Sequence, residues 1–285
     1  MKTTLNKKNR TDSWRFRFML TFILGLVTIG VFFFCTKQLL ANLQKEATAN
    51  VEALPTETLD LGGVKMEFVL IPPGTFIMGS DEETGDGDEK PAHKVTLTQP
   101  FYLGKYEVTQ EQWVKVIGSN PSKFKGPKLP VDSVSWDECQ RFLLKLQEMD
   151  GRKFTLPTEA QWEYACRAGT ISRCFFGDNY NIAGNYAWIA TNSGNKTHQV
   201  GKKKPNPWGI YDIYGNVQEL CADWYANPYQ GIDATNPLGP SHGDSRILRG
   251  GAWGDDPMNI RSAYRNAIGQ DIGNDGIGLR CVMLH

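Results

Sequence analysis

The sequence predicts a loop-rich α+β domain that follows one N-terminal transmembrane helix. An uncharged apolar segment lies close to the N-terminus. Three segments between residues 109 and 169 carry the start signals and the spacing of amphipathic helices. Short β-type segments precede them, and no long helical pattern is visible after residue 170, where Asn, Gly, Asp and Trp recur.

The N-terminal 60 residues have the charge pattern of a membrane anchor. Residues 18–35 (FMLTFILGLVTIGVFFFC) carry no charge, and as a helix they would span about 27 Å, close to the thickness of a hydrocarbon core. Basic side chains precede them, against the single acid Asp12, so the positive-inside rule places the N-terminus in the cytoplasm. The predicted parts are a cytoplasmic basic tail (1–17), a transmembrane signal anchor (18–36), a polar stalk (37–60) and an extracytoplasmic domain (61–285), periplasmic or at the cell surface.

A cleaved signal peptide is the alternative to an anchor. The apolar segment ends in three phenylalanines, which make a poor cleavage site, but cleavage near Leu40 and Ala41 stays open. Five cysteines follow the anchor, so an extracytoplasmic site permits disulfides and the odd count leaves at least one thiol outside any intramolecular pair. The formal net charge is zero, which gives no electrostatic footprint for nucleic acid.

Short strands are predicted over residues 64–70, 75–78, 94–97 and 101–106. The first two are separated by a Pro-Pro-Gly turn, which favours a hairpin between them. The acidic residues 81–90 lack the spacing of an EF-hand and are predicted to form a solvated loop.

Capping boxes predict three helix starts, at Thr109, Ser135 and Thr158. In each, a hydroxyl residue is followed three positions later by Gln or Glu. The second helix is predicted to end at Gly151 and the third at Gly169. The apolar face of the second helix repeats at i, i+3 and i+4 and comprises Trp136, Cys139, Phe142, Leu143, Leu146 and Met149.

Seven motifs, taken together and in order, carry a family resemblance. They are IPPGTFIMG (71–79), YEVTQ (106–110) with Trp113, PVDSVSW (130–136), LPTEAQWEY (156–164), DIYGNVQE (212–219), LRGGAW (248–253) and GLR (278–280). This series resembles the formylglycine-generating enzyme family, also called the sulfatase-modifying factor domain, over about residues 60–283. The resemblance implies a C-type-lectin-like fold with few helices, short twisted sheets and much irregular structure.

The resemblance also implies structural calcium. The family ligands would fall on Asp212, the carbonyls of Gly215 and Val217, and Glu219, a mixture of carboxylates and carbonyls that suits Ca²⁺. The alternative is that Asp212 caps a turn while Glu219 pairs with an arginine. A second family site would begin at Asn185 and Tyr186, but the loop that follows is short here and shows no clear acidic ligand.

The copper-binding cysteine pair of the family's oxidases is absent. The first position falls near Asp255 and the second at Asn259 or Ile260. Soft Cu(I) prefers thiolates, so copper binding and formylglycine generation by the family mechanism are not expected. The resemblance places Cys281 at a disulfide position of the family, whose partner position is Leu143 here. Because Cys139 lies one turn away on the same helix face, a Cys139–Cys281 bond is the alternative.

Two classes of function remain open. The first is a non-catalytic recognition domain whose loops bind an extracytoplasmic protein, peptide or glycan. The second is an enzyme of the same family, either a sulfatase-modifying oxidase or one that modifies a periplasmic small molecule. The candidate ligand face comprises Arg249, Trp253, Asp255, Asp256, Arg261, Tyr264 and Arg265, and the competing interpretation of its charges is a structural salt-bridge network.

Overall fold

The structure, a computed structural model, describes residues 53–83, 85–227, 229 and 234–284. The predicted basic tail, the anchor and most of the stalk lie within residues 1–52, outside the described residues. In the part that is described, no helix has the length and apolar character needed to cross a membrane.

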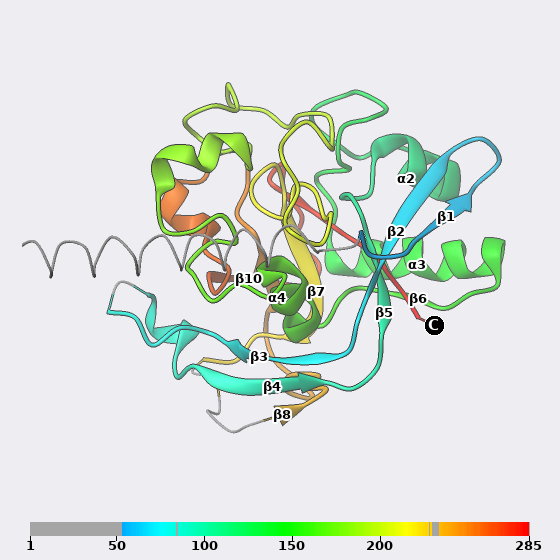
Figure 1. The fold of residues 1–285 in the computed structure, drawn as a ribbon. Helices are drawn as coiled ribbons and strands as arrows, with labels where there is room; N and C mark the ends of the chain where they lie inside the picture. The colour runs from blue at the N-terminus through cyan, green and yellow to red at the C-terminus, as the bar shows by residue number, and fades with distance from the viewer. Residues whose placement is uncertain (1–52, 84, 228, 230–233, 285) are drawn as a thin grey trace, which may run out of the picture. The chain divides into compact units, whose positions relative to one another are not determined.

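Three small sheets organise the described chain (Figure 1). All three mix consecutive strands with strands far apart in the sequence, so part of their pairing is non-local. The five-stranded sheet has the order β1 (Thr56–Asp60), β2 (Lys65–Ile71), β5 (Phe101–Gly104), β12 (Val282–Met283) and β6 (Phe154–Thr155). The four-stranded sheet has the order β10 (Arg265–Ile268), β9 (Arg246–Arg249), β7 (Gln218–Trp224) and β11 (Ile277–Gly278), and the three-stranded sheet has the order β3 (Gly74–Met78), β4 (His93–Leu97) and β8 (Ala234–Thr235).

Strand β1 corrects the predicted boundary of the stalk. Residues 56–60 were predicted to belong to the stalk, but they pair antiparallel with β2, from Thr56 opposite Val69 to Asp60 opposite Lys65. Leu59 lies in the core, while its neighbours in β1 are polar, so the strand is half-buried. A single buried side chain among polar ones gives too weak an alternation for the sequence to reveal.

The predicted hairpin between β2 and β3 is also wrong. Both strands form, but β2 lies between β1 and β5, and β3 pairs with β4 in another sheet. Pro72 and Pro73 separate the two strands and have no backbone N–H to donate, so the ladder of β2 cannot extend through them. The chain therefore leaves the first sheet at this point.

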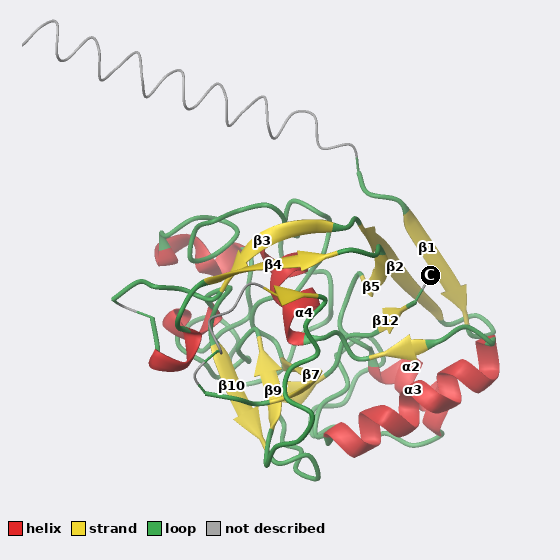
Figure 2. Ribbon diagram, turned by 90° about the horizontal axis from the view of Figure 1, so that it is seen from below, coloured by secondary structure: helices red, strands yellow, loops and turns green. Residues whose placement is uncertain are grey.

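All three predicted helices form, each with its capping box (Figure 2). Helix α2 (Gln110–Ile117) is capped by Thr109, α3 (Trp136–Asp150) by Ser135 and α4 (Glu159–Arg167) by Thr158. Gly151 caps the C-terminus of α3 in the left-handed conformation, as predicted, whereas Ala168 rather than Gly169 caps α4.

Helices α2 and α3 pack against each other and beside the five-stranded sheet (Figure 2). The rings of Trp113 and Phe142 stack between them, with centroids 4.9 Å apart. Four residues of the predicted apolar face of α3 are buried, but Met149 at its end is half exposed. The buried four are Cys139, Phe142, Leu143 and Leu146.

The chain after α4 consists mainly of ordered loops, as predicted. Its helical segments are short 3₁₀ turns, η2 (Tyr180–Asn185) and η3 (Pro257–Ile260). Gly250 follows β9 with φ of 95°, and a Cβ there would lie 2.9 Å from the carbonyl oxygen of Ile213. Glycine is therefore needed for this close crossing of two loops, which positions the segment after β9.

Candidate functional site

A cavity of about 380 Å³ lies where the loop after β9 meets the four-stranded sheet. We call it the Trp253 pocket. Its walls come from β7, β9, β10, β11 and the loops beside them. The lining residues are Gln218, Leu248, Ala252, Trp253, Gly254, Asp255, Asn266, Ala267, Ile268, Asn274, Asp275, Gly276 and Ile277.

Trp253 is fixed at the edge of this pocket. Its backbone N–H donates to the carbonyl of Asn216, and its indole Nε1 donates to the carbonyl oxygen of Asp275 at 2.8 Å. Its ring meets that of Phe124 edge to face, with centroids 5.6 Å apart. The backbone of Trp253 is thus fixed by one hydrogen bond, and its indole by a second hydrogen bond and one ring contact.

A chain of polar side chains crosses the pocket wall. Asn266 donates to Gln218 Oε1 at 3.1 Å, and Gln218 Nε2 donates to Asp255 Oδ2 at 2.9 Å. The same oxygen of Asp255 accepts the backbone N–H of Ala252 at 2.7 Å. Asp255, at the first cysteine position of the family's oxidases, is therefore an acceptor in a fixed hydrogen-bond network.

The second cysteine position is no better suited to a soft metal. The backbone N–H of Asn259 donates to the carbonyl of Asp256 inside η3, and Ile260 is fully buried. The five described cysteines are all buried, and each is a free thiol. The suggested Cys139–Cys281 bond is thus not formed. Burial raises the pKa of both thiols, which makes them poor nucleophiles.

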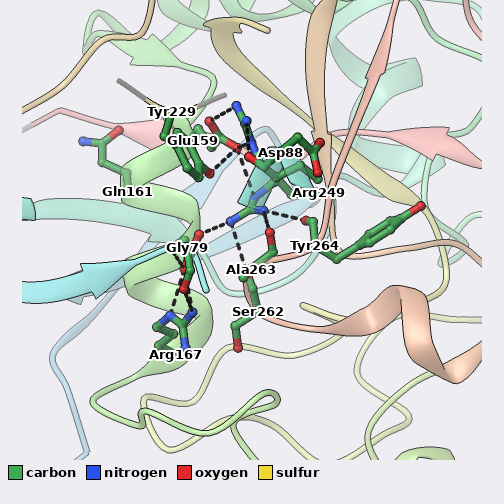
Figure 3. Close-up of polar contacts among 12 residues, drawn as sticks. Gly79, Asp88, Glu159, Gln161, Arg167, Tyr229, Arg249, Ser262, Ala263 and Tyr264 are labelled. Carbon is green, nitrogen blue, oxygen red and sulfur yellow. Dashed lines mark hydrogen bonds and ion pairs between the residues drawn. The ribbon is translucent and has the colours of Figure 1, made fainter. Parts of the chain in front are cut away.

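Three arginines of the predicted ligand face lie inside ion pairs, and Figure 3 shows the surroundings of one of them, Arg249. Arg249 pairs with Glu163 and donates to the carbonyls of residues 262–264. Arg265 makes a bidentate pair with Glu159, with Nε–Oε1 and Nη2–Oε2 distances of 2.6 and 2.9 Å. Arg261 pairs with Glu89 and Asp86, although it also lines a separate cavity beside β3.

These pairs match the competing interpretation of the predicted face, a structural network. They also correct the expectation of a solvated acidic loop, because Glu89 is fully buried against Arg261. Of the remaining predicted residues, Asp256 caps η3, accepting from Met258 N at 2.9 Å. Tyr264 is half-buried, and its ring extends away from Arg249 (Figure 3). Only Trp253 and Asp255 of the seven line the Trp253 pocket.

The proposed calcium ligands fall in a buried cluster of charges. Glu219 accepts from Arg280 at 2.7 Å and from the indole of Trp162 at 2.8 Å. Asp212, in a left-handed turn with φ of 52°, accepts from the N–H of Gly201 at 2.6 Å through Oδ2. Its Oδ1 atom is buried and has no hydrogen-bond partner.

Glu107 completes this cluster, and the motif resemblance did not assign it a role. Its carboxylate accepts from Asn216 Nδ2 at 2.6 Å and from the N–H of Val217 at 3.1 Å. Burial, and then the negative charges of Asp212 and Glu219, raise its pKa well above the ordinary value. Burial likewise raises the pKa of Asp212 to about 6. Gly215 closes the same turn by donating to the carbonyl of Gly250.

The region of the second family calcium site contains a lysine. Lys203 Nζ donates to the carbonyl of Gly184 at 2.5 Å and lies 3.6 Å from the ring centroid of Trp188. The carbonyl of Asn185 accepts from Lys204 N at 3.0 Å, and Tyr186 stacks on Phe176. Within the described residues, no group of three or more His, Cys, Asp or Glu side chains is arranged to hold a metal ion.

Fold and site together define a class: a mixed α/β domain with small sheets and a loop-built pocket. The sulfatase-modifying factor enzyme 1-like domain family matches residues 61–284, and this chain belongs to that family. The predicted family is thus confirmed, and the match reaches almost the same boundaries as the seven motifs.

The individual relatives are named for different roles. The chain is 28% identical over 305 residues to the formylglycine-generating enzyme of Mus musculus, with 83% of this chain and 80% of that protein covered. It is 32% identical over 234 residues to the chaperone protein LppX of Paenibacillus barcinonensis, with 63% and 80% covered. It is 33% identical over 244 residues to the serine/threonine-protein kinase pkn1 of Chlamydia pneumoniae, with 75% of this chain covered but only 37% of that longer protein.

Solved structures support the fold. The Treponema denticola variable protein 1 superimposes with a TM-score of 0.77 at 30% identity, covering 81% of this chain and 99% of that one. The structural match and the family match extend over the same domain, so the mixed α/β architecture of the family is confirmed for this chain.

Proposed function

We propose that this domain recognises a ligand at the Trp253 pocket and does not use the copper and cysteine chemistry of the family's oxidases. The observation that carries the proposal is the chemistry of the two cysteine positions. One holds Asp255 in a hydrogen-bond network, and the other holds Asn259 or the buried Ile260. A carboxylate, an amide and an alkyl chain do not form a two-thiolate Cu(I) site.

The pocket has the composition of a binding site. An aromatic edge, two carboxylates and several amides converge on a concavity of about 380 Å³. Its polar groups come from loops supported by a sheet, which is a common arrangement for recognition. The ligand classes that fit are a protein, a peptide or a glycan.

The test uses the purified protein, copper and a peptide with the Cys-x-Pro-x-Arg sequence of sulfatases. We expect no change in peptide mass. A loss of mass equal to conversion of the cysteine CH₂SH group to an aldehyde would overturn the proposal. Ligand capture by the protein, and its loss in Trp253→Ala, would support it.

An enzymatic role is the second candidate. Its support is the 28% identity to a formylglycine-generating enzyme over 83% of this chain. The peptide experiment decides whether sulfatase modification occurs. Modification of another periplasmic small molecule would instead require turnover that is lost in Asp255→Asn, because Asp255 is one of the two carboxylates that line the pocket and the one that is hydrogen-bonded to Gln218 in its wall.

We also propose one structural calcium site at Asp212, with the carbonyls of Gly215 and Val217 and with Glu219. The unpartnered Oδ1 of Asp212 supports it, as does the excess of three buried carboxylates over the two cations that face them, the guanidinium of Arg280 and the ammonium of Lys203. A divalent cation would supply the missing positive charge. We propose no second site, because Lys203 already supplies an ammonium group near Asn185.

Thermal unfolding with and without calcium tests this site. Calcium should raise the unfolding temperature of the wild-type protein, while Asp212→Ala should show no calcium response. Asp271→Ala, an exposed acid on the loop after β10, should respond like the wild type. An equal calcium response in Asp212→Ala would refute the assignment.

We further propose that residues 18–36 anchor the protein in a membrane, with the domain on the extracytoplasmic side. The support is the uncharged segment and the basic residues before it. Protease added outside intact cells should digest the domain and leave a small membrane-bound fragment. Recovery of the domain from the soluble fraction, with its N-terminus beyond residue 36, would show cleavage instead.

A further inference from the structure

A strongly basic cleft lies beside the Trp253 pocket. It has a volume of about 620 Å³ and is built by the loop between α2 and α3 and by the loop that follows Trp188. We call it the basic cleft. None of its lining residues is an acid: they are Lys123, Phe124, Lys125, Leu129, Lys196, Thr197, His198, Gln199 and Lys202.

The positive charge in the cleft is only partly balanced. Lys123 Nζ pairs with Asp275 Oδ2 at 2.5 Å, and Lys125 Nζ donates to the neutral carbonyl of Asn120 at 3.0 Å. Lys196 and Lys202 are exposed and have no acidic partner within 4 Å among the described residues. The zero net charge of the chain therefore conceals a local concentration of cations.

A second observation at the cleft points to a ligand. The Thr197 side chain is 2% exposed, and its Oγ1 is buried without any hydrogen-bond partner. A buried hydroxyl normally finds a partner, because leaving it unpaired costs about 1–3 kcal/mol. His198 beside it is held by stacking on Trp188 and by a 2.6 Å contact from Nε2 to the carbonyl of Ser193.

The cleft and the Trp253 pocket share one wall. Phe124 lines the cleft and contacts the ring of Trp253, which lines the pocket. Lys123 of the cleft pairs with Asp275 of the pocket, whose carbonyl accepts from the Trp253 indole. A ligand that crosses this aromatic wall would touch both cavities.

The two cavities differ in charge, and this difference limits the ligand. The cleft offers lysines, while the pocket offers the carboxylates of Asp255 and Asp275 together with amide groups. A nucleic acid carries a phosphate at every step and would meet those carboxylates. A sugar chain can carry a neutral, hydroxyl-bearing ring beside an anionic ring, and hydroxyls pair well with carboxylates and amides.

We propose that the ligand is an acidic oligosaccharide that spans both cavities. A neutral ring occupies the Trp253 pocket, and a ring bearing a carboxylate or a sulfate occupies the basic cleft, against Lys196, Lys202 and the Thr197 hydroxyl. This proposal rests on the proposed recognition function, because it uses the same pocket.

Calorimetry with the full-length protein tests it. The probes are a sulfated heparin tetrasaccharide, a polygalacturonate oligosaccharide, neutral dextran and a single-stranded DNA oligonucleotide. At least one acidic saccharide should bind and dextran should not. The double variant Lys196→Ala/Lys202→Ala should bind about tenfold more weakly, while Lys115→Ala/Lys145→Ala, which removes two exposed lysines from α2 and α3, should bind like the wild type.

Four outcomes contradict the proposal. If neither acidic saccharide binds, the ligand is not an acidic oligosaccharide. If dextran binds as tightly as the acidic saccharides, recognition does not require an anionic group on the ligand. Equal binding of DNA that is unaffected by Trp253→Ala would reduce the cleft to a non-specific cation patch. A ligand captured by the protein, dependent on Trp253 but independent of Lys196 and Lys202, would refute the acidic saccharide and leave the recognition function in place.

Discussion

Glu163 joins two arginines in a buried network at the centre of the domain. It pairs with Arg249, accepts from Arg167 Nε at 2.9 Å and accepts from the backbone N–H of Gly79 at 2.9 Å (Figure 3). Burial alone would raise the pKa of Glu163, but the two guanidinium groups hold it below its ordinary value. One carboxylate thus neutralises charge from α4 and from β9.

Replacing this carboxylate should be severe. In Glu163→Gln, Arg249 and Arg167 lose their shared counter-ion, and we expect a loss of about 3–5 kcal/mol in the free energy of unfolding. Urea denaturation measures it. Glu148→Gln on the exposed side of α3 is the matched control and should change little. Equal stability of the two variants would show that the network is not needed.

The ionised form of Asp223 destabilises the folded protein at neutral pH, whereas the ionised form of Glu163 stabilises it. It lies at the end of β7, where burial and then the charge of Glu159 raise its pKa to about 7. Between its ordinary value and pH 7 the folded protein therefore binds more protons than the unfolded chain. Stability falls as pH rises across that window, by up to about 1.4 kcal/mol per pH unit for this group.

Asp223→Asn should flatten this dependence. The amide oxygen can still accept the backbone N–H of Glu159, a bond of 2.9 Å in the wild type. We expect the variant to be more stable than the wild type at pH 8 and similar at pH 4, measured by denaturant titration across the range. Parallel curves for both proteins would contradict the raised pKa.

At the scale of elements, β1 defines where the domain begins. Leu59 and Leu61 are buried in the core, and β1 protects the outer edge of β2. A chain shortened to begin at residue 62 should lose several kcal/mol, whereas a chain that begins at residue 53 should unfold like the full-length protein. Thermal unfolding of the two shortened chains makes the comparison. Equal unfolding temperatures would show that residues 56–60 belong to the stalk and not to the folded domain.

Local signals made some elements predictable and others not. The capping boxes at Thr109, Ser135 and Thr158 are complete within four residues, so the sequence shows them directly. Strand β3 pairs with β4, which lies beyond an acidic loop, and no local pattern in the sequence identifies this pairing. Strand pairing across long separations is the part of this fold that requires the structure.

The same limit applies to the site. Trp253, which ends the LRGGAW motif, and Asp255, at the first cysteine position of the family's oxidases, do line the pocket. Arg249, Arg261 and Arg265 were placed on the same face because their region corresponds to the catalytic face of the active relatives. Their partners Glu163, Glu89 and Glu159 come from distant segments, so only the structure shows that their charges are already neutralised. The basic cleft was missed for the same reason, since its lysines come from two loops.

At the scale of the described domain, two hydrophobic clusters are built on the same strands. In β2, Phe68 belongs to the cluster around α2 and α3, while Val69 belongs to the cluster around α4. Strands β7, β9 and β12 divide their neighbours in the same way, because successive side chains of a strand point to opposite faces. Neither cluster can lose its strands without exposing the other.

This arrangement predicts one cooperative unfolding transition rather than two. Leu146→Ala in the first cluster and Ile210→Ala in the second should each lower the free energy of unfolding by about 2–5 kcal/mol. In both variants, tryptophan fluorescence and far-ultraviolet circular dichroism should give coincident curves. If one variant separates the two curves, the clusters unfold independently and the strands do not couple them. Coincidence in both variants would mean that the pocket, which uses β7 and β9, has the stability of the whole domain.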